Sequence, residues 1–224
     1  IGTVLAAVRG RDALMRDVRR QVNELGVPGR SYEIWLSEWN SVDANPGPQI
    51  LQHVNALYIA DYLGHLAQSP IQIANLWALY NGRDKRLGDY SLLAPTGDPQ
   101  GSNFRRPAYW AFAMLAGTLK GTLLTASTDQ ENLSAWLAKR PDGKLAVVLV
   151  NKSLETDFQT TLKIAGLKGV ATISVLTAAT SGGLLGPDAM GKAHPSTGPS
   201  TEQRELGNGA TILVPKASIV TVSY

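Results

Sequence analysis

Residues 31–40 read S-Y-E-I-W-L-S-E-W-N, and residues 71–80 read I-Q-I-A-N-L-W-A-L-Y. Both stretches are rich in aromatic and β-branched residues, which favours β-strands. Apolar residues at helical spacing predict helices before, between and after them, over residues 10–25, 49–67 and 107–119. Strands that are separated by helices pair in parallel through right-handed crossovers. The first half of the chain is therefore predicted to be an α/β unit.

Two parallel strands cannot form a stable sheet alone, because both faces and both edges of the sheet would need cover. This half is therefore expected to complete a larger α/β body, whose missing strands lie upstream or in another chain. The sequence begins with Ile1 rather than Met. We expect it to be a piece of a longer polypeptide.

The second half has a different character from about residue 120. Short runs of branched and apolar residues follow one another, with turn signals such as P-D-G at residues 141–143 between them. Seven strands are predicted, near residues 121–127, 133–139, 144–151, 156–164, 170–177, 209–214 and 217–223. This spacing is typical of an antiparallel sandwich. Residues 180–207, rich in Gly, Pro, Ser and Thr, are predicted to form a long exposed loop.

The composition limits the classes of protein that fit. The 224 residues are 44% hydrophobic and 17% charged, which is typical of a globular protein. The sequence contains no cysteine, which excludes thiol catalysis and Cys-ligated zinc. The net charge is +3, and we interpret the densest basic stretch as a solvated helix face rather than a nucleic-acid site. Its members are Arg9, Arg11, Arg16, Arg19 and Arg20.

Motifs for metals, cofactors and membranes are missing from the sequence. His53, His65 and His194 are far apart and form no H-x-x-x-H or H-E-x-x-H pair, so we expect no zinc site. There is no G-x-x-x-x-G-K phosphate loop and no G-x-S-x-G elbow. No apolar run is long enough to cross a bilayer. We therefore expect no cofactor, no metal, no membrane and no nucleic acid among its partners.

Glu38 is the first candidate for a functional residue. Regular strand alternation would place it on one face with Tyr32, Ile34 and Leu36, at the end of an otherwise apolar row. Burying an isolated charge is expensive, so a carboxylate at this position needs a partner or a task. The alternative is a glutamate at the end of a strand that simply reaches solvent.

Trp77 lies near the same end of the next predicted strand. In parallel α/β barrels the active site forms at the carboxyl ends of the strands. A carboxylate and an indole from neighbouring strand ends suit sugar chemistry, because the carboxylate can attack an anomeric carbon and the indole can stack on a sugar. Core packing is the alternative role for Trp77.

The stretches S-E-W-N at residues 37–40, N-A-L-Y-I-A-D-Y-L at 55–63 and I-A-N-L-W-A-L-Y-N-G at 73–82 together carry a family resemblance. They resemble the last two βα units of the retaining glycoside hydrolases of clan A. The β-xylosidase and α-L-arabinofuranosidase families are most similar, because they share an E-W or E-W-N motif on the seventh barrel strand. Two later stretches, D-Y-S-L-L-A-P at 89–95 and R-R-P-A-Y-W-A-F at 105–112, resemble their final loop and eighth helix.

The resemblance covers most of residues 10–224 and implies a fold of the α/β plus all-β class. Residues 1–119 would be the C-terminal part of a (β/α)8 TIM barrel, with strands seven and eight and their helices. Residues 120–224 would be the antiparallel β-sandwich that these families add after the barrel.

The resemblance also implies roles for single residues. Glu38 would be the catalytic nucleophile that forms a covalent glycosyl-enzyme intermediate. Trp77 would be a sugar-stacking wall of the first subsite. Trp39, Asn40 and Tyr80 would line the pocket, although a structural role is an equal alternative for each of them.

The sequence departs from the family pattern because it lacks a general acid/base residue. That residue is usually the glutamate of an Asn-Glu pair at the end of the fourth barrel strand. The Asn23-Glu24 pair is rejected because it ends a predicted helix on the side away from the site. Glu33 is rejected because strand alternation would turn it to the face opposite Glu38. The acid/base is therefore expected from an N-terminal portion of the same enzyme, as a separate or cleaved chain.

The implied activity is a retaining hydrolase of plant-type or microbial polysaccharides or oligosaccharides, of the arabinofuranosidase, xylosidase or endoglucanase type. A secreted, extracellular or periplasmic location would suit it. The first alternative is a non-catalytic carbohydrate-binding or assembly subunit whose sandwich carries the function. The second is a structural two-domain protein in which Glu38 only makes a buried hydrogen bond.

Overall fold

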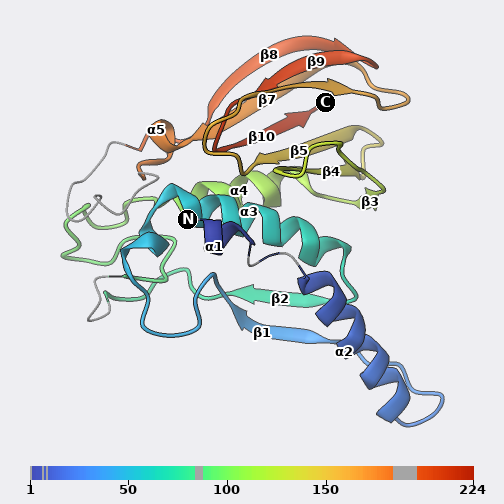
Figure 1. Cartoon of the computed structure of the whole chain (residues 1–224), viewed down its shortest axis with the longest axis vertical. Helices are drawn as coiled ribbons and strands as arrows, with labels where there is room; N and C mark the ends of the chain where they lie inside the picture. The colour runs from blue at the N-terminus through green and yellow to red at the C-terminus, as the bar shows by residue number, and fades with distance from the viewer. Residues whose placement is uncertain (1, 7, 9, 84–87, 184–195) are drawn as a thin grey trace.

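The fold is taken from a computed structural model that describes residues 2–6, 8, 10–83, 88–183 and 196–224. Its elements are stacked in layers (Figure 1). A two-stranded parallel sheet lies on one side and a pair of helices covers it. A six-stranded antiparallel sheet follows, with a second two-stranded sheet on its far side.

The first half of the chain forms the parallel sheet and the helices. In chain order its elements are α1 (Gly2–Ala6), α2 (Arg11–Leu25), β1 (Trp35–Trp39), the 3-10 helix η1 (Pro48–Leu51), α3 (His53–Gln68), β2 (Ile73–Leu76) and α4 (Pro107–Thr118). Strands β1 and β2 pair in parallel, as their separation by a helix predicts. The short helix α1 lies where the sequence predicts no element.

Two of these helices have opposite environments. α3 is buried on nearly all sides, because it is packed between the parallel sheet, α4 and the six-stranded sheet. α2 projects from this body (Figure 1), and its apolar residues Leu14, Val18 and Leu25 are exposed. Among the residues that the structure describes, no helix combines the length and apolar character that crossing a bilayer requires.

The second half of the chain forms the antiparallel sheets. Its elements are β3 (Thr122–Leu124), β4 (Leu133–Lys139), β5 (Leu145–Asn151), β6 (Phe158–Leu162), β7 (Lys168–Thr177), α5 (Ala178–Ser181), β8 (Ser200–Gly207), β9 (Ala210–Val214) and β10 (Ser218–Ser223). The larger sheet has the strand order β3-β4-β5-β10-β7-β8, and β6 pairs with β9 in the smaller one. Every pairing is antiparallel, as predicted.

The six-stranded sheet contributes to two apolar cores. In β5, Val148 and Val150 pack with the helices, whereas Val147 and Leu149 pack toward the small sheet. This is the period of two that a strand with both faces covered requires. The first core also contains Trp136 of β4, so the α/β half and the sheets share one interior.

The prediction of a loop over residues 180–207 is wrong for its last third. Strand β8 lies there and pairs with β7 at the edge of the larger sheet. Its sequence, S-T-E-Q-R-E-L-G, is polar on both faces, and only Leu206 is buried. An edge strand without an apolar row gives no hydrophobic period to detect. His194 and Arg9 lie outside the described residues.

Candidate active site

The parallel sheet brings two chain segments together where its strands end. Both strands run toward the side of the molecule where the long connecting segments gather (Figure 1). Trp39 pairs with Leu76 in the register, and the backbone N–H of Trp77 donates to the carbonyl of Trp39 at 3.0 Å. Glu38, Trp39, Asn40 and Trp77 therefore lie at the same carboxyl edge, as the sequence predicts.

β1 does not alternate its side chains regularly. Leu36 packs against the helices and Trp39 is buried, whereas Ser37 and Glu38 between them are both exposed. The register with β2 shifts between Leu36 and Trp39, which is the irregularity that an extra residue in a strand produces. The prediction that Glu38 shares the face of Leu36 is therefore wrong. Glu38 instead lies on the face of β1 that points away from the helices.

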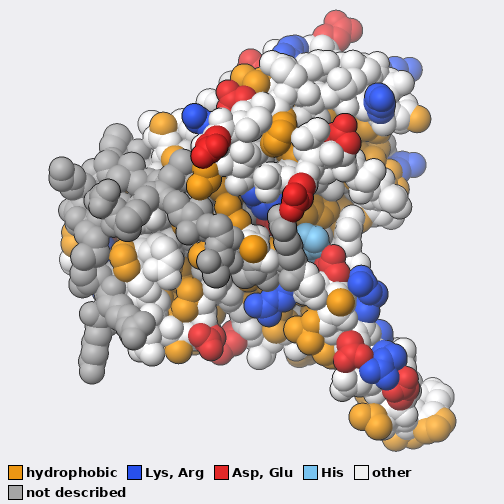
Figure 2. Space-filling model, viewed as in Figure 1, with side chains coloured by type: hydrophobic (Ala, Val, Ile, Leu, Met, Phe, Trp, Pro, Cys, Tyr) orange, Lys and Arg blue, Asp and Glu red, His pale blue; other side chains and the backbone are white. Residues whose placement is uncertain are grey.

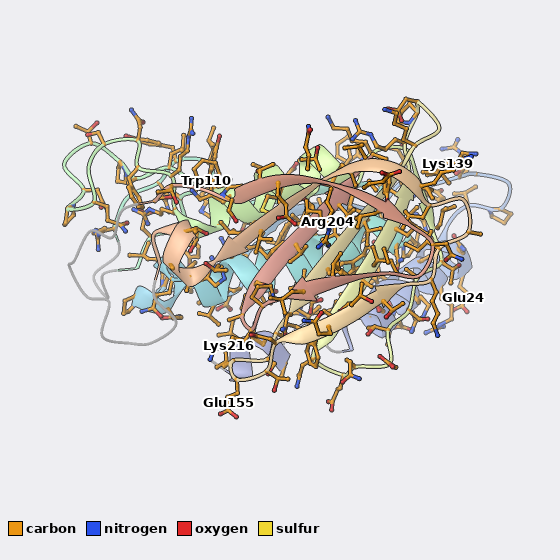
Figure 3. All side chains as sticks on the ribbon, turned by 90° about the horizontal axis from the view of Figure 1, so that it is seen from above. Glu24, Trp110, Lys139, Glu155, Arg204 and Lys216 are labelled. Atoms are coloured by element: carbon orange, nitrogen blue, oxygen red, sulfur yellow. The ribbon has the colours of Figure 1, made fainter. Side chains whose placement is uncertain are left out.

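Two other glutamates can be compared with Glu38. Glu33 accepts a hydrogen bond from Nε1 of the exposed Trp35 at 2.9 Å, so it lies on the same open face and alternation does not exclude it. The distance between Glu33 and Glu38 does exclude Glu33 as the acid/base, because five extended residues span on the order of 16 Å. Glu24 pairs with Arg20 at 2.7 Å. It lies at the opposite end of the molecule from the connecting segments (Figure 3).

Trp77 is exposed, and its backbone is bonded to that of Trp39, the residue that follows Glu38. Its side chain is 49% exposed, although it follows directly on a strand of the sheet. The side-chain amide of Asn40 donates a hydrogen bond to the carbonyl of Trp77, and the Trp77–Ala78 peptide bond is cis. Oδ1 of Asn40 accepts from the backbone N–H of Ser41 at 2.7 Å. Asn40 is thus used to fix Trp77, which is a structural role.

Trp39 occupies a different place from the one predicted. Its side chain is only 7% exposed and meets the ring of Tyr62 edge to face, with 4.9 Å between ring centroids. It lies with the helices, on the face of β1 opposite Glu38. Trp39 therefore packs in the core and does not line a pocket, contrary to the expectation.

Tyr80 is exposed and continues the segment that begins with Trp77. Its hydroxyl accepts a hydrogen bond from the backbone N–H of Thr96 at 2.8 Å. Tyr80 is thereby attached to the segment of residues 88–106, which we call the covering loop. We call residues 77–80 the wall segment.

A buried ionic network that the sequence did not reveal lies in the covering loop. Arg106 donates to Asp89 at 2.7 Å and to Asp98 at 3.0 Å, and these three side chains are almost completely buried. Arg83 also donates to Asp98, at 2.9 Å. The four residues are spread over a stretch without regular periodicity, so the only signal in the sequence was balanced charge.

The charges of this network shift the pKa values of Asp98 and Arg106. Burial raises the pKa of the Asp98 carboxyl, but hydrogen bonds from Arg83 and Gln100 and the charge of Arg106 outweigh it, and the pKa falls below its ordinary value. Burial lowers the pKa of Arg106, whereas the negative charges of Asp89 and Asp98 raise it and offset part of this effect. An arginine nevertheless keeps its proton at any pH at which a protein is folded.

Among the described residues, no group of three or more His, Asp or Glu side chains is arranged to hold a metal ion. His53 is fully buried; its two ring nitrogens lie 2.9 Å from Oγ of Ser181 and 2.9 Å from the carbonyl of Ala217. His65 contacts Asp12 at 2.9 Å. His53 and His65 thus each have partners on other elements of the fold.

At the level of sequence, no protein-family model and no curated protein matches the chain. Solved structures with a similar fold do exist. An α-L-arabinofuranosidase from Thermotoga maritima superposes with a TM-score of 0.74 and 17% identity, over 99% of this chain and 49% of that chain. A GH51 α-L-arabinofuranosidase from Thermotoga petrophila RKU-1 superposes with a TM-score of 0.75 and 18% identity, over 98% of this chain and 49% of that chain.

A GH39 enzyme from Xanthomonas axonopodis pv. citri matches with a TM-score of 0.63 and 16% identity, over 93% of this chain and 47% of that chain. The chain spans about half the length of these structures. Sequence identities of 16–18% show a shared fold and nothing more. The resemblance to clan A glycoside hydrolases is thus confirmed at the level of the fold, which this chain shares with part of those enzymes.

Proposed function

We propose that this chain is part of a retaining glycoside hydrolase in which Glu38 is the nucleophile. The observation that carries the proposal is the position of Glu38: exposed, at the carboxyl end of a parallel strand, on the helix-free face and beside Trp77. In a (β/α)8 barrel that face is the interior and that end carries the catalytic residues. β1 and β2 would be its seventh and eighth strands, with residues 1–119 in the barrel and 120–224 in the sandwich.

The proposed chemistry proceeds in two steps. The ionised carboxylate of Glu38 attacks the anomeric carbon, a new C–O bond forms, and the glycosidic C–O bond breaks. The leaving oxygen takes a proton from an acid in the portion that completes the barrel, because no second carboxylate of this chain is proposed to face Glu38. Water then cleaves the glycosyl ester and returns its proton to that same acid/base residue. Trp77 and Tyr80 would hold the sugar in place.

Features of the surface support a completing portion. β1 pairs only with β2 among the described strands, so its outer edge is open to another strand. On α2, hydrophobic side chains gather at the outer end (Figure 2), and Val18, Val22 and Leu25 line a hollow of about 450 Å³ with Tyr32. A further strand could pair with the open edge of β1, and its helix could cover the apolar stripe of α2. We propose the N-terminal portion of the same enzyme, as a separate or cleaved chain, as that partner.

The substrate would be an arabinofuranoside, a xylan or a glucan, because an α-L-arabinofuranosidase, a bifunctional glucanase-xylanase and a xylanase share the fold. The test is Glu38→Ala in the complete enzyme, assayed on activated glycosides of each class. Turnover should fall by a factor on the order of 10⁴ or more, because the nucleophile is lost. Added azide should restore part of the rate and give a glycosyl azide. Glu33→Ala, on the same open face, is the matched control and should keep normal turnover.

Normal turnover in Glu38→Ala would end the assignment. The competing function is a non-catalytic carbohydrate-binding or assembly subunit. It predicts polysaccharide binding by the complete protein that neither Glu38→Ala nor Trp77→Ala weakens.

A further inference from the structure

The wall segment depends on the covering loop for its position. Beyond β2, the N–H of Ala78 donates to the carbonyl of Tyr90 at 3.3 Å. The carbonyls of Ala78 and Leu79 accept from Leu92 at 2.9 Å and from Leu93 at 3.1 Å. With the bond from Thr96 to Tyr80, these contacts pair the wall segment with the loop as if the loop were a third strand. A displacement of the loop would therefore move Trp77 and Tyr80.

Arg106 joins both ends of the covering loop to its tip. It sits directly before α4, and its guanidinium binds Asp89 at the beginning of the loop. The same guanidinium binds Asp98, which belongs to the turn at the tip. The N–H of Arg106 also donates to the carbonyl of Leu92 at 3.0 Å. One residue, through its buried side chain and its backbone N–H, thus fixes three points of the loop relative to a helix of the core.

Arg83 extends this network to the wall segment. It follows Tyr80 by three residues and donates to both carboxylate oxygens of Asp98, at 2.9 and 3.1 Å. This two-point geometry fixes the guanidinium in orientation as well as in distance. The network therefore holds the wall segment from its far side, while β2 holds it from the near side.

The energetics favour a positioning role over a stabilising one. Buried ion pairs contribute little net stability compared with apolar packing, because both charges lose their hydration. They do fix one geometry, because any displacement leaves a buried charge without its partner. In this network Asp98 binds both guanidinium groups, and Arg106 binds both carboxylates. This arrangement suits a positioning role.

We propose that the network of Arg83, Asp98, Arg106 and Asp89 positions the wall segment, and thereby sets the affinity of the site for its sugar rather than the rate of bond cleavage. This inference rests on the proposed function. Arg83 and Asp98 are positioning residues that act through Trp77 and Tyr80.

Arg83 is the residue to vary, because it is partly exposed and its removal leaves Asp98 paired with Arg106. In the complete enzyme, Arg83→Ala should raise KM about tenfold, the effect expected for one charge-assisted hydrogen bond, and change kcat less than about twofold. Arg83→Lys should recover part of the affinity. Arg20→Ala is the matched control, because it also removes an arginine that makes ion pairs, here with Asp17 and Glu24 on the exposed surface of α2. It should leave both constants unchanged.

Hydrogen exchange provides a readout that does not depend on activity. The amides of Leu92 and Leu93, which donate to the wall segment, should exchange faster in Arg83→Ala and normally in Arg20→Ala. Unchanged KM together with unchanged exchange at these amides would overturn the inference. A fall in kcat and in melting temperature in both Arg83→Ala and Arg83→Lys would also overturn it, because that pattern would show that Arg83 only stabilises the fold. Failure of the proposed function is recognised separately, by normal turnover in Glu38→Ala.

Discussion

Glu38 reaches the open face of β1 because the strand loses its alternation between Leu36 and Trp39. The same irregularity turns Trp39 into the core against Tyr62. Two adjacent residues thus have opposite environments: the carboxylate is exposed, and the indole packs against the helices. The ring of Trp39 is buried and that of Trp77 is half-exposed, although sequence analysis grouped both in one site.

The two tryptophans should respond differently to truncation. Trp77→Ala removes a half-exposed wall and should raise KM about tenfold, the loss expected when one aromatic face no longer covers a sugar, while stability hardly changes. Trp39→Ala removes a buried ring and should lower the free energy of unfolding by about 3–5 kcal/mol. Steady-state kinetics and urea titrations of the complete enzyme would separate the two effects. Equal loss of stability in both variants would contradict this division.

The sequence predicted the position of the site more fully than its orientation. Glu38, Trp77 and Tyr80 could be located because strand ends are visible in the pattern of apolar residues. The face of Glu38 could not, because an irregularity of one residue leaves no mark in a short strand. The Arg106 network could not be predicted either, since its members come from a segment where tertiary contacts, and no local period, decide the structure.

Helix α3 is the element that joins the α/β half to the six-stranded sheet. It contacts β5 and β10, and its Gly64 lies so close to Trp136 of β4 that any side chain there would overlap the indole ring. Helix interiors ordinarily disfavour glycine. The predicted helix was correct in its bounds to within a few residues, yet only the structure explains why it contains this glycine.

Gly64→Ala should therefore lower the free energy of unfolding by about 1–3 kcal/mol, because the cost of overpacking exceeds the gain in helix propensity. Gly117→Ala is the matched control in α4. A Cβ at that position meets no atom within 4 Å, so the variant should be as stable as the wild type or more stable by up to about 1 kcal/mol. Thermal unfolding of both variants would measure the difference. A Gly64→Ala protein at least as stable as the Gly117→Ala protein would contradict the packing described.

At the scale of the whole molecule, the layers are tied together by polar groups as well as by apolar cores. Lys152 of the segment after β5 donates to the buried Asp61 of α3 at 2.8 Å and to Ser134 of β4 at 2.9 Å. His53 joins the start of α3 to Ser181 and to Ala217, which precedes β10. Among the described elements, the outer edge of β1, the helix-free face of the parallel sheet and the exposed face of α2 lack such cover.

His53 should make stability depend on pH. Burial lowers its pKa to about 4, and the hydrogen bond to the Ala217 carbonyl opposes this only partly. Between pH 6.5, the ordinary value, and about 4, the unfolded chain binds a proton that the folded chain does not. This contribution to stability is complete above pH 6.5, and roughly 3 kcal/mol of it is lost as the pH falls to about 4.

Denaturant titrations between pH 4 and pH 6.5 would measure how steeply the free energy of unfolding depends on pH. His53→Gln should flatten it, whereas Ser181→Ala, which keeps the imidazole, should retain it. A slope that is the same in His53→Gln as in the wild type would contradict the assignment to this residue.

The exposed stripe of α2 should become buried in the complete enzyme. Leu14 is 54% exposed and Leu213 of β9 is 48% exposed, so in this chain they are equivalent surface positions. If α2 packs against the completing portion, Leu14→Asp should lower the melting temperature by several degrees, because it buries a charge. Leu213→Asp should leave the melting temperature almost unchanged. Equal, small effects of both substitutions would contradict the proposed partner surface.

The most direct test of the central claim is covalent trapping of the nucleophile. The complete enzyme is incubated with activated 2-fluoro glycosides of arabinofuranose and of xylose, which form the glycosyl ester and hydrolyse slowly, and the labelled peptide is sequenced by mass spectrometry. We predict a single glycosyl adduct on the carboxylate of Glu38, and none in Glu38→Ala. An adduct on another residue, or hydrolysis without any adduct and with inversion at the anomeric carbon, would contradict the account.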